Sequence, residues 1–133
     1  MTACSQVQWF GSTGSPTIKW QNMSLKSLEN SLEYSEFYSF SAGGILRAPN
    51  RLSGVYTIYA NLNCLYVGKT EHQSLQKRLF DHYRNCHNLY LKRWILSDRQ
   101  LRFRFIIVKD ASLIDSLEKA LIQKLSPSCN VRK

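Results

Sequence analysis

The segments GVYTIY at residues 54–59 and LYVGKT at residues 65–70 decide the fold. Both are rich in β-branched and aromatic residues, which favour strands. Residues 61–63, Asn-Leu-Asn, lie between them, and asparagine tolerates the positive φ of a tight turn. We therefore predict a β-hairpin. If position 61 is the centre of the turn, Tyr56 and Tyr66 stand directly opposite on one face. A one-residue slip would separate their faces, so we expect a turn with an odd number of residues and a bulge.

Helix and strand signals flank this hairpin. On the N-terminal side, a helix capped by Ser24 is expected to run to about Tyr38, and residues 41–53 indicate a loop. On the C-terminal side we predict helices that begin after Ser74 and Asn88, a strand over 102–108, and a last helix opened by a Ser112–Asp115 capping box and stopped by Pro127. The expected fold is α+β: a small three-stranded antiparallel sheet flanked by helices, β-β-α-α-β-α, with an N-terminal helical extension.

Charge divides the chain near residue 50. Residues 1–50 carry no net charge, whereas residues 51–133 hold 15 Lys and Arg against 6 Asp and Glu, which accounts for the formal net charge of +9. We therefore expect an N-terminal extension over 1–50, made of a loop and one helix, and a functional domain over 51–133. A basic domain of this kind attracts a polyanion, most often nucleic acid. Four apolar residues suggest that part of the extension packs: Trp9, Phe10, Ile18 and Trp20.

The composition argues against several classes of protein. With 44% hydrophobic residues, the chain is not wholly disordered. The cysteines at 4, 64, 86 and 129 lack zinc-ligand spacing, so we expect reduced thiols in a cytoplasmic protein. We expect no secretory signal, and no apolar stretch approaches the ~20 residues that span a bilayer.

Candidate reactive residues follow the hairpin. Arg78 and His82 are four positions apart on a predicted helix and so share a face. Glu118 has isoleucine four positions away on either side, and a carboxylate in an apolar line costs burial energy unless something compensates it. A divalent cation would do so, although an ordinary glutamate at the edge of an amphipathic stripe is an alternative. Asn130 carries no signal by itself.

These residues together resemble a known family. Gly54-Val55-Tyr56 and Tyr66-Val67-Gly68 are similar to the two signature tripeptides of the GIY-YIG nucleases, with valine in place of isoleucine at both middle positions. Further family elements follow in order, up to residue 130: Lys69, Arg78 with His82 four later, Glu118, and Asn130 twelve after that. The resemblance implies a metal-dependent endonuclease that hydrolyses DNA phosphodiester bonds by a one-metal mechanism, leaving 5′-phosphate and 3′-hydroxyl ends.

The resemblance also implies how charge on the phosphate is handled. Glu118 would hold the single divalent metal, Mg²⁺ or Mn²⁺. Arg78 would bind a phosphate oxygen, because its fork geometry suits an oxyanion. Tyr66 would order the water or the phosphate by hydrogen bonding. Asn130 would brace the site or contact the scissile strand. We expect the phenols, the guanidinium and the acid to gather on one face of the sheet.

Tyr56 is the candidate general base. A free tyrosine has a pKa near ~10, and a nearby cation lowers the pKa of a phenol, so Lys69 is the expected helper. His82 could instead take or relay the proton. Three simpler interpretations stay open at this point: Tyr56 and Tyr66 only pack together, Lys69 is a solvated charge, and His82 has no proton role.

Five basic residues are expected to follow the phosphate backbone: Lys92, Arg93, Arg99, Arg102 and Arg104. Targeting would come from residues 1–50, from a homodimer, from a partner protein or from DNA shape. Two alternatives remain for the function. One is a non-catalytic or structure-selective nucleic-acid-binding module of the same fold, and the other is a sequence-specific restriction or homing-type nuclease.

Overall fold

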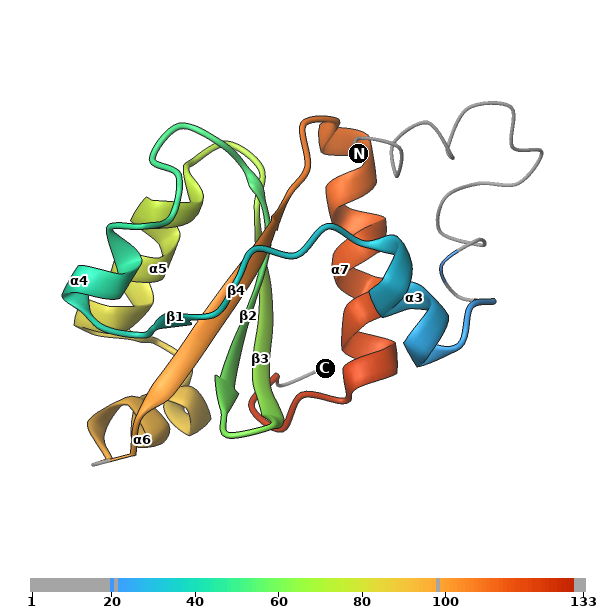
Figure 1. The fold of residues 1–133 in the computed structure, drawn as a ribbon. Coiled ribbons are helices and arrows are strands. Elements are labelled where there is room, and N and C mark those ends of the chain that lie inside the picture. Colours follow the sequence, from blue (N-terminus) through green and yellow to red (C-terminus); the bar gives the residue numbers. More distant parts are fainter. Residues whose placement is uncertain (1–19, 21, 98, 131–133) are drawn as a thin grey trace.

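A four-stranded antiparallel sheet with strand order β1-β4-β2-β3 forms the centre of the molecule. The structure is a computed structural model and describes residues 20, 22–97 and 99–130. The strands are β1 (Tyr38–Ser39), β2 (Gly54–Ala60), β3 (Asn63–Thr70) and β4 (Leu101–Ile107). One face carries α4 (Ala42–Ile45), α5 (Leu75–Asn85) and α6 (Leu89–Leu96), and the other carries α3 (Leu25–Ser31) and α7 (Ala111–Leu125) (Figure 1).

The α+β class and the antiparallel sheet are confirmed, but the sheet has one strand more than predicted. Strand β1 pairs with β4 through Tyr38 opposite Phe103. The helix predicted to reach Tyr38 ends at Ser31, because the chain beyond it runs extended along β4. The backbone N–H of Ser35 donates to the carbonyl of Phe105 at 2.7 Å. Two residues are too few to show a strand period, so only the pairing with β4 identifies β1.

The helix signals downstream of the hairpin agree closely with the structure. Ser74 caps α5 and Asn88 caps α6, as predicted, each side chain accepting a backbone N–H of the first turn. Two local predictions are wrong. The N-cap of α7 is Asp110, whose carboxylate accepts from the Ser112 backbone, so no Ser112–Asp115 box forms. The predicted loop over 41–53 contains the one-turn helix α4.

The β2–β3 hairpin differs from the predicted register in an informative way. The turn holds two residues, Asn61 with φ 56° and Leu62, and a bulge lies between Ile58 and Tyr59. Tyr56 therefore stands opposite Gly68, not opposite Tyr66. A two-residue turn alone would put the two tyrosines on opposite faces. The extra residue that the bulge adds to β3 returns Tyr66 to the face of Tyr56.

Two apolar clusters hold the layers together. On the α5 face, β2 and β4 contribute Tyr56, Ile58, Phe103 and Phe105 to the packing against Leu79. On the α7 face the cluster consists of these buried side chains: Trp20, Leu28, Val55, Val67, Ile106, Ile114, Leu117, Ala120 and Leu121.

Some predictions concern residues that the structure does not describe. Trp20 is buried, whereas Trp9, Phe10, Ile18 and Cys4 lie outside the described residues. The cysteines at 64, 86 and 129 are free thiols, as expected. Within the described part of the chain, every helix is too short or too polar to cross a membrane.

Candidate active site

The Tyr56 side chain lies across Gly68 on the neighbouring strand. A Cβ atom at position 68 would come within 2.3 Å of both the phenol oxygen and the ring carbon that bears it. Any side chain larger than hydrogen at position 68 would therefore displace the ring. Tyr56 is also 0% exposed, so the phenol is held beneath the surface by its neighbours.

His82 is the direct polar partner of this phenol. The Tyr56 hydroxyl oxygen lies 2.7 Å from Nε2 of His82, whose Nδ1 faces the Cys86 sulfur at 3.6 Å. Burial, and to a smaller extent the nearby Arg78 charge, lowers the pKa of His82 to about 4, so the imidazole is neutral near pH 7. With the proton on Nδ1, Nε2 accepts a hydrogen bond from the Tyr56 hydroxyl.

The electrostatic environment of Tyr56 opposes its ionisation. Burial raises its pKa well above the usual value, and Tyr66 and Glu118 act in the same direction. Arg78 opposes them, because its positive charge lowers the pKa of the phenol. Arg78 is the cation that lowers this pKa most, and the role of Lys69 in activating Tyr56 stays a prediction.

Lys69 is held by carboxylates. Its ammonium group lies 2.6 Å from Asp115 on α7 and 3.1 Å from Glu71. The hydrogen bond to Asp115 raises the pKa of Lys69. Asp115 was predicted only as part of a helix cap. Its contact with Lys69 joins β3 to α7 and could not be found from local sequence.

Tyr66 and Arg78 line a pocket beside the buried pair. The Tyr66 ring lies 5.1 Å from the His82 ring and 6.2 Å from the Tyr56 ring, between centroids. The pocket measures about 590 Å³ and is lined by Tyr66, Arg78, Asp81, His82, Arg84, Asn85, His87 and Asn88. The two tyrosines thus differ in access: Tyr66 is partly exposed to this pocket and Tyr56 is covered.

Glu118 approaches the site from α7, which covers the opposite face of the sheet (Figure 1). Its charge raises the pKa of both Tyr56 and Lys69, so it acts across the β3 edge. The prediction that all the groups share one face is therefore wrong: the site straddles the edge strand. This arrangement is possible because β3 ends the sheet and Gly68 presents no side chain there.

Asn130 closes the same edge. Its side chain accepts from the backbone N–H of Val67 at 2.8 Å and donates to the carbonyl of Val67 at 2.9 Å. The amide thus imitates a neighbouring strand. Of the two predicted roles for Asn130, this geometry supports bracing of the site.

The predicted phosphate-contacting residues fall into two groups. Lys92, Arg93 and Arg99 are exposed. Arg104 is half-buried on the α7 face, where its guanidinium carbon lies 3.5 Å from the Tyr34 ring centroid and an end nitrogen lies 3.7 Å from Glu29. Arg102 stacks over Phe37 and donates to the Asn61 carbonyl at 3.0 Å. Neither Arg102 nor Arg104 is directed toward the tyrosine site, because residues alternate across β4 and this face holds α7.

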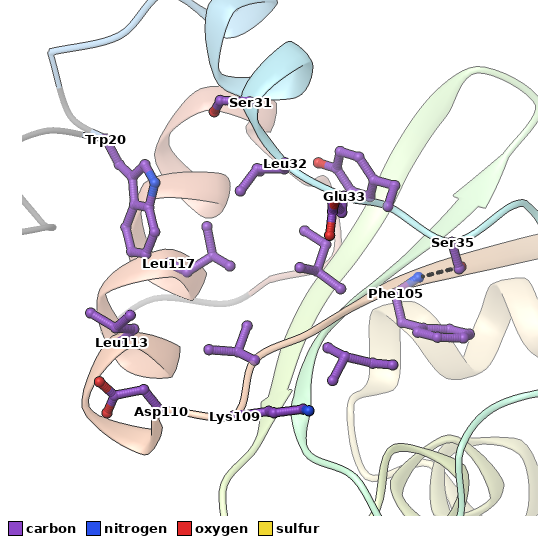
Figure 2. A pocket seen from close by; sticks show the side chains of 14 residues that line it. Trp20, Ser31, Leu32, Glu33, Ser35, Phe105, Lys109, Asp110, Leu113 and Leu117 are labelled. Atoms are coloured by element: carbon purple, nitrogen blue, oxygen red, sulfur yellow. Dashed lines mark hydrogen bonds between the residues drawn. The ribbon is translucent and has the colours of Figure 1, made fainter. Parts of the chain in front are cut away.

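A larger pocket of about 720 Å³ lies away from this chemistry, between α7, β4 and the segment after α3. Figure 2 shows Trp20, Leu32, Leu113 and Leu117 around it, with Lys109 and Asp110 at one side. It is mainly apolar and contains none of the tyrosine-site residues. We therefore assign the reactive centre to the smaller pocket and the adjoining β3 edge.

Comparisons with known proteins agree with this geometry. The family model of the GIY-YIG catalytic domain matches residues 52–132. Among solved structures, the N-terminal GIY-YIG endonuclease domain of UvrC from Thermotoga maritima, bound to magnesium as its catalytic divalent cation, has 31% identity and a TM-score of 0.52. The match covers 65% of this chain and 91% of that one.

A tyrosine-to-phenylalanine mutant of the same domain, also bound to its catalytic divalent cation, has 28% identity over 66% of this chain, with a TM-score of 0.53. No curated protein matches the sequence. The family match covers more than half of the chain and includes both tripeptides and the residues around them. The protein therefore belongs to the GIY-YIG catalytic domain family and is a nuclease.

Proposed function

We propose that this protein is an endonuclease that hydrolyses DNA phosphodiester bonds with one divalent metal ion, leaving 5′-phosphate and 3′-hydroxyl ends. The observation that carries the proposal is the cluster around Gly68. There a phenol is hydrogen bonded to a neutral imidazole at 2.7 Å, and a guanidinium and a carboxylate act on the same phenol from either side. Such a cluster can move a proton and stabilise negative charge on a phosphate.

The residues present fit a magnesium or manganese ion. Glu118 offers the hard oxygen ligand that Mg²⁺ prefers, and Mg²⁺ is commonly bound through one or two carboxylates together with waters and substrate phosphates. Glu118 is the residue that would hold the ion, because its charge acts on both Tyr56 and Lys69 at the β3 edge. A bound divalent ion would supply positive charge to the scissile phosphate and to the departing oxygen.

Tyr56 and His82 would move the proton. A water reaching the Tyr56 oxygen can give it a proton while the phenol passes its own proton to Nε2 of His82, which ends as imidazolium. Because the pKa of Tyr56 is raised, a free phenolate is unfavourable. Moving both protons together avoids forming it. Because Tyr56 is fully covered in the free protein, substrate binding has to open its oxygen to that water. Catalytic contacts in free enzymes often form fully only with substrate bound.

Tyr66 and Arg78 would position the substrate. Both line the pocket, and both lie beside the buried pair. The Arg78 guanidinium can hold a non-bridging phosphate oxygen through its fork of donors. The partly exposed Tyr66 hydroxyl can donate to the same phosphate or to the attacking water. Lys69 would keep α7 in place against β3 through Asp115, so that Glu118 stays at the edge.

The test is cleavage of end-labelled linear, nicked and branched DNA with magnesium or manganese. Glu118→Gln is expected to lower the cleavage rate by more than about 100-fold, beyond the effect of a residue that only supports a ligand. DNA binding without metal should change little. The matched control is Glu36→Gln, at an exposed acid, which should leave both readouts unchanged.

Equal loss of binding and cleavage in Glu118→Gln would contradict the metal-holding role. DNA binding without cleavage in either metal would favour a non-catalytic binding module instead.

A further inference from the structure

Helix α6 presents large apolar side chains to solvent. Leu89 is 70% exposed, Tyr90 55% and Leu96 74%. Single exposed apolar residues are ordinary, but three on an eight-residue helix form a patch that needs an explanation. The same helix is anchored on its other side by Leu91, which is fully buried.

These side chains share one side of the helix. Residues 89, 93 and 96 are four and three positions apart, so Leu89, Arg93 and Leu96 follow one line along α6. Tyr90 stands beside this line. We call these four residues the outer face of α6. Trp94 and Ile95 point the other way and pack on the core cluster of the α5 side.

The outer face begins at the rim of the catalytic pocket. Asn88, the N-cap of α6, lines that pocket, and so does His87. A strand whose phosphate sits against Tyr66 and Arg78 therefore meets the start of α6 when it leaves the pocket past His87 and Asn88.

The charge of this region favours a polyanion. Residues 86–99 contain Lys92, Arg93 and Arg99 against one acidic residue, Asp98. Arg99, beyond the end of the helix, lies over the Trp94 ring at 5.3 Å from its centroid. A basic helix with exposed aromatic and aliphatic side chains has two kinds of contact to offer, to phosphates and to the faces of bases.

We propose that the outer face of α6 binds unstacked bases of the DNA strand whose scissile phosphate occupies the pocket. The preferred substrate is then DNA that carries a single-stranded or branched segment beside the cleavage point. In an intact duplex the base faces are stacked, so Leu89, Tyr90 and Leu96 would have no apolar surface to cover. Apolar side chains contact bases where steps are opened, and aromatic rings stack on single strands without regard to sequence. This inference rests on the proposed function of the same site.

The experiment measures binding separately from cleavage. Glu118→Gln protein is titrated with a forked DNA and with a fully paired DNA of equal length, without metal. Adding Leu89→Ser, Tyr90→Ser and Leu96→Ser is expected to weaken binding of the fork at least about tenfold, the scale of losing stacking on one or two bases. Binding of the duplex should change by less than about twofold, because the phosphate contacts remain.

Two controls make the result specific. Leu46→Ser changes an apolar residue that is 62% exposed at the C-cap of α4 and does not line the catalytic pocket, and it should alter neither affinity. Thermal unfolding of each variant checks the fold, which should hold because the substituted side chains are largely exposed.

Equal weakening on both DNAs, or none on either, would overturn the proposal. A change of oligomeric state in the triple variant, measured by sedimentation, would also overturn it and assign the face to a protein contact. Fork-selective binding without any cleavage by the unmodified chain would sink the proposed function while leaving this inference standing. Cleavage without any preference for the fork would contradict this inference while leaving the proposed function standing.

Discussion

His82 shows how one buried side chain links the site to the stability of the fold. Its pKa is about 4 in the folded protein, mainly because of burial, against 6.5 for an ordinary histidine. The unfolded chain therefore binds the extra proton first as pH falls. The contribution of His82 to the free energy of unfolding is complete above about pH 6.5 and decreases as pH falls toward about 4. At 1.36 kcal/mol for each pKa unit, the full loss is about 3 kcal/mol.

We expect this loss to appear in urea unfolding at about pH 7 and about pH 5. The unfolding free energy of the unmodified protein should fall about 2 kcal/mol more between these values than that of His82→Gln, which has no imidazole to protonate. Other titrating groups are common to both proteins and cancel in the comparison. A decline of the same size in both proteins would mean that His82 is not buried in its neutral form.

Tyr56 and Tyr66 are the clearest case of two residues that the sequence cannot tell apart. Both occur in strands of aromatic and β-branched residues, each inside a signature tripeptide. In the structure, Tyr56 is covered and hydrogen bonded to His82, whereas Tyr66 lines the pocket. The difference arises because Tyr56 lies on an inner strand and Tyr66 on the edge strand.

Among the elements, the β2–β3 hairpin does most to fix the positions of the two tyrosines. Its bulge places both tyrosines on one face, and its register sets Tyr56 opposite Gly68. Gly68→Ala is expected to push the Tyr56 ring aside, because the new Cβ would lie 2.3 Å from it. We expect a loss of about 1–3 kcal/mol in the free energy of unfolding, typical of overpacking, together with a large loss of cleavage.

Gly43→Ala in α4 is the matched control for this substitution. A Cβ atom at position 43 meets nothing within 4 Å, so activity and stability should be unchanged or stability slightly higher. Unfolding curves and cleavage rates of the two variants check the contrast. Full activity in Gly68→Ala would show that the position of Tyr56 above Gly68 is unimportant for the reaction.

At the scale of the whole molecule, the formal net charge of +9 does not by itself say where DNA lies. Lys92 and Arg93 are exposed, whereas Arg104 is occupied by Tyr34 and Glu29 on the α7 face. If DNA lies along α6, a variant that lacks the exposed cations of α6 releases fewer counterions from the DNA on binding than the unmodified protein does. Each phosphate contact to duplex DNA contributes about 0.9 to the slope of log affinity against log salt concentration.

Lys92→Gln with Arg93→Gln is therefore expected to reduce the magnitude of this slope by about 2. Arg104→Gln should leave the slope unchanged and reduce stability, because the cation–π contacts with Tyr34 and Phe37 are lost. Anisotropy titrations at four or more salt concentrations give the slopes. A reduction for Arg104→Gln as large as for the α6 pair would restore the sequence-based assignment of Arg104 to the phosphate backbone.

The sequence alone determined the family signature and the elements with strong local signals. The caps of α5 and α6, the two hairpin strands and β4 were all predictable, because caps and side-chain periods depend on neighbours a few residues away. Tertiary structure alone decided the additional strand β1, the register across the bulge and the approach of Glu118 from the far side of the sheet. It also decided the contacts of Lys69 with Asp115 and of Asn130 with Val67, which join residues 46 and 63 positions apart. Contacts at such separations depend on how whole elements pack, and no local pattern of residues encodes that packing.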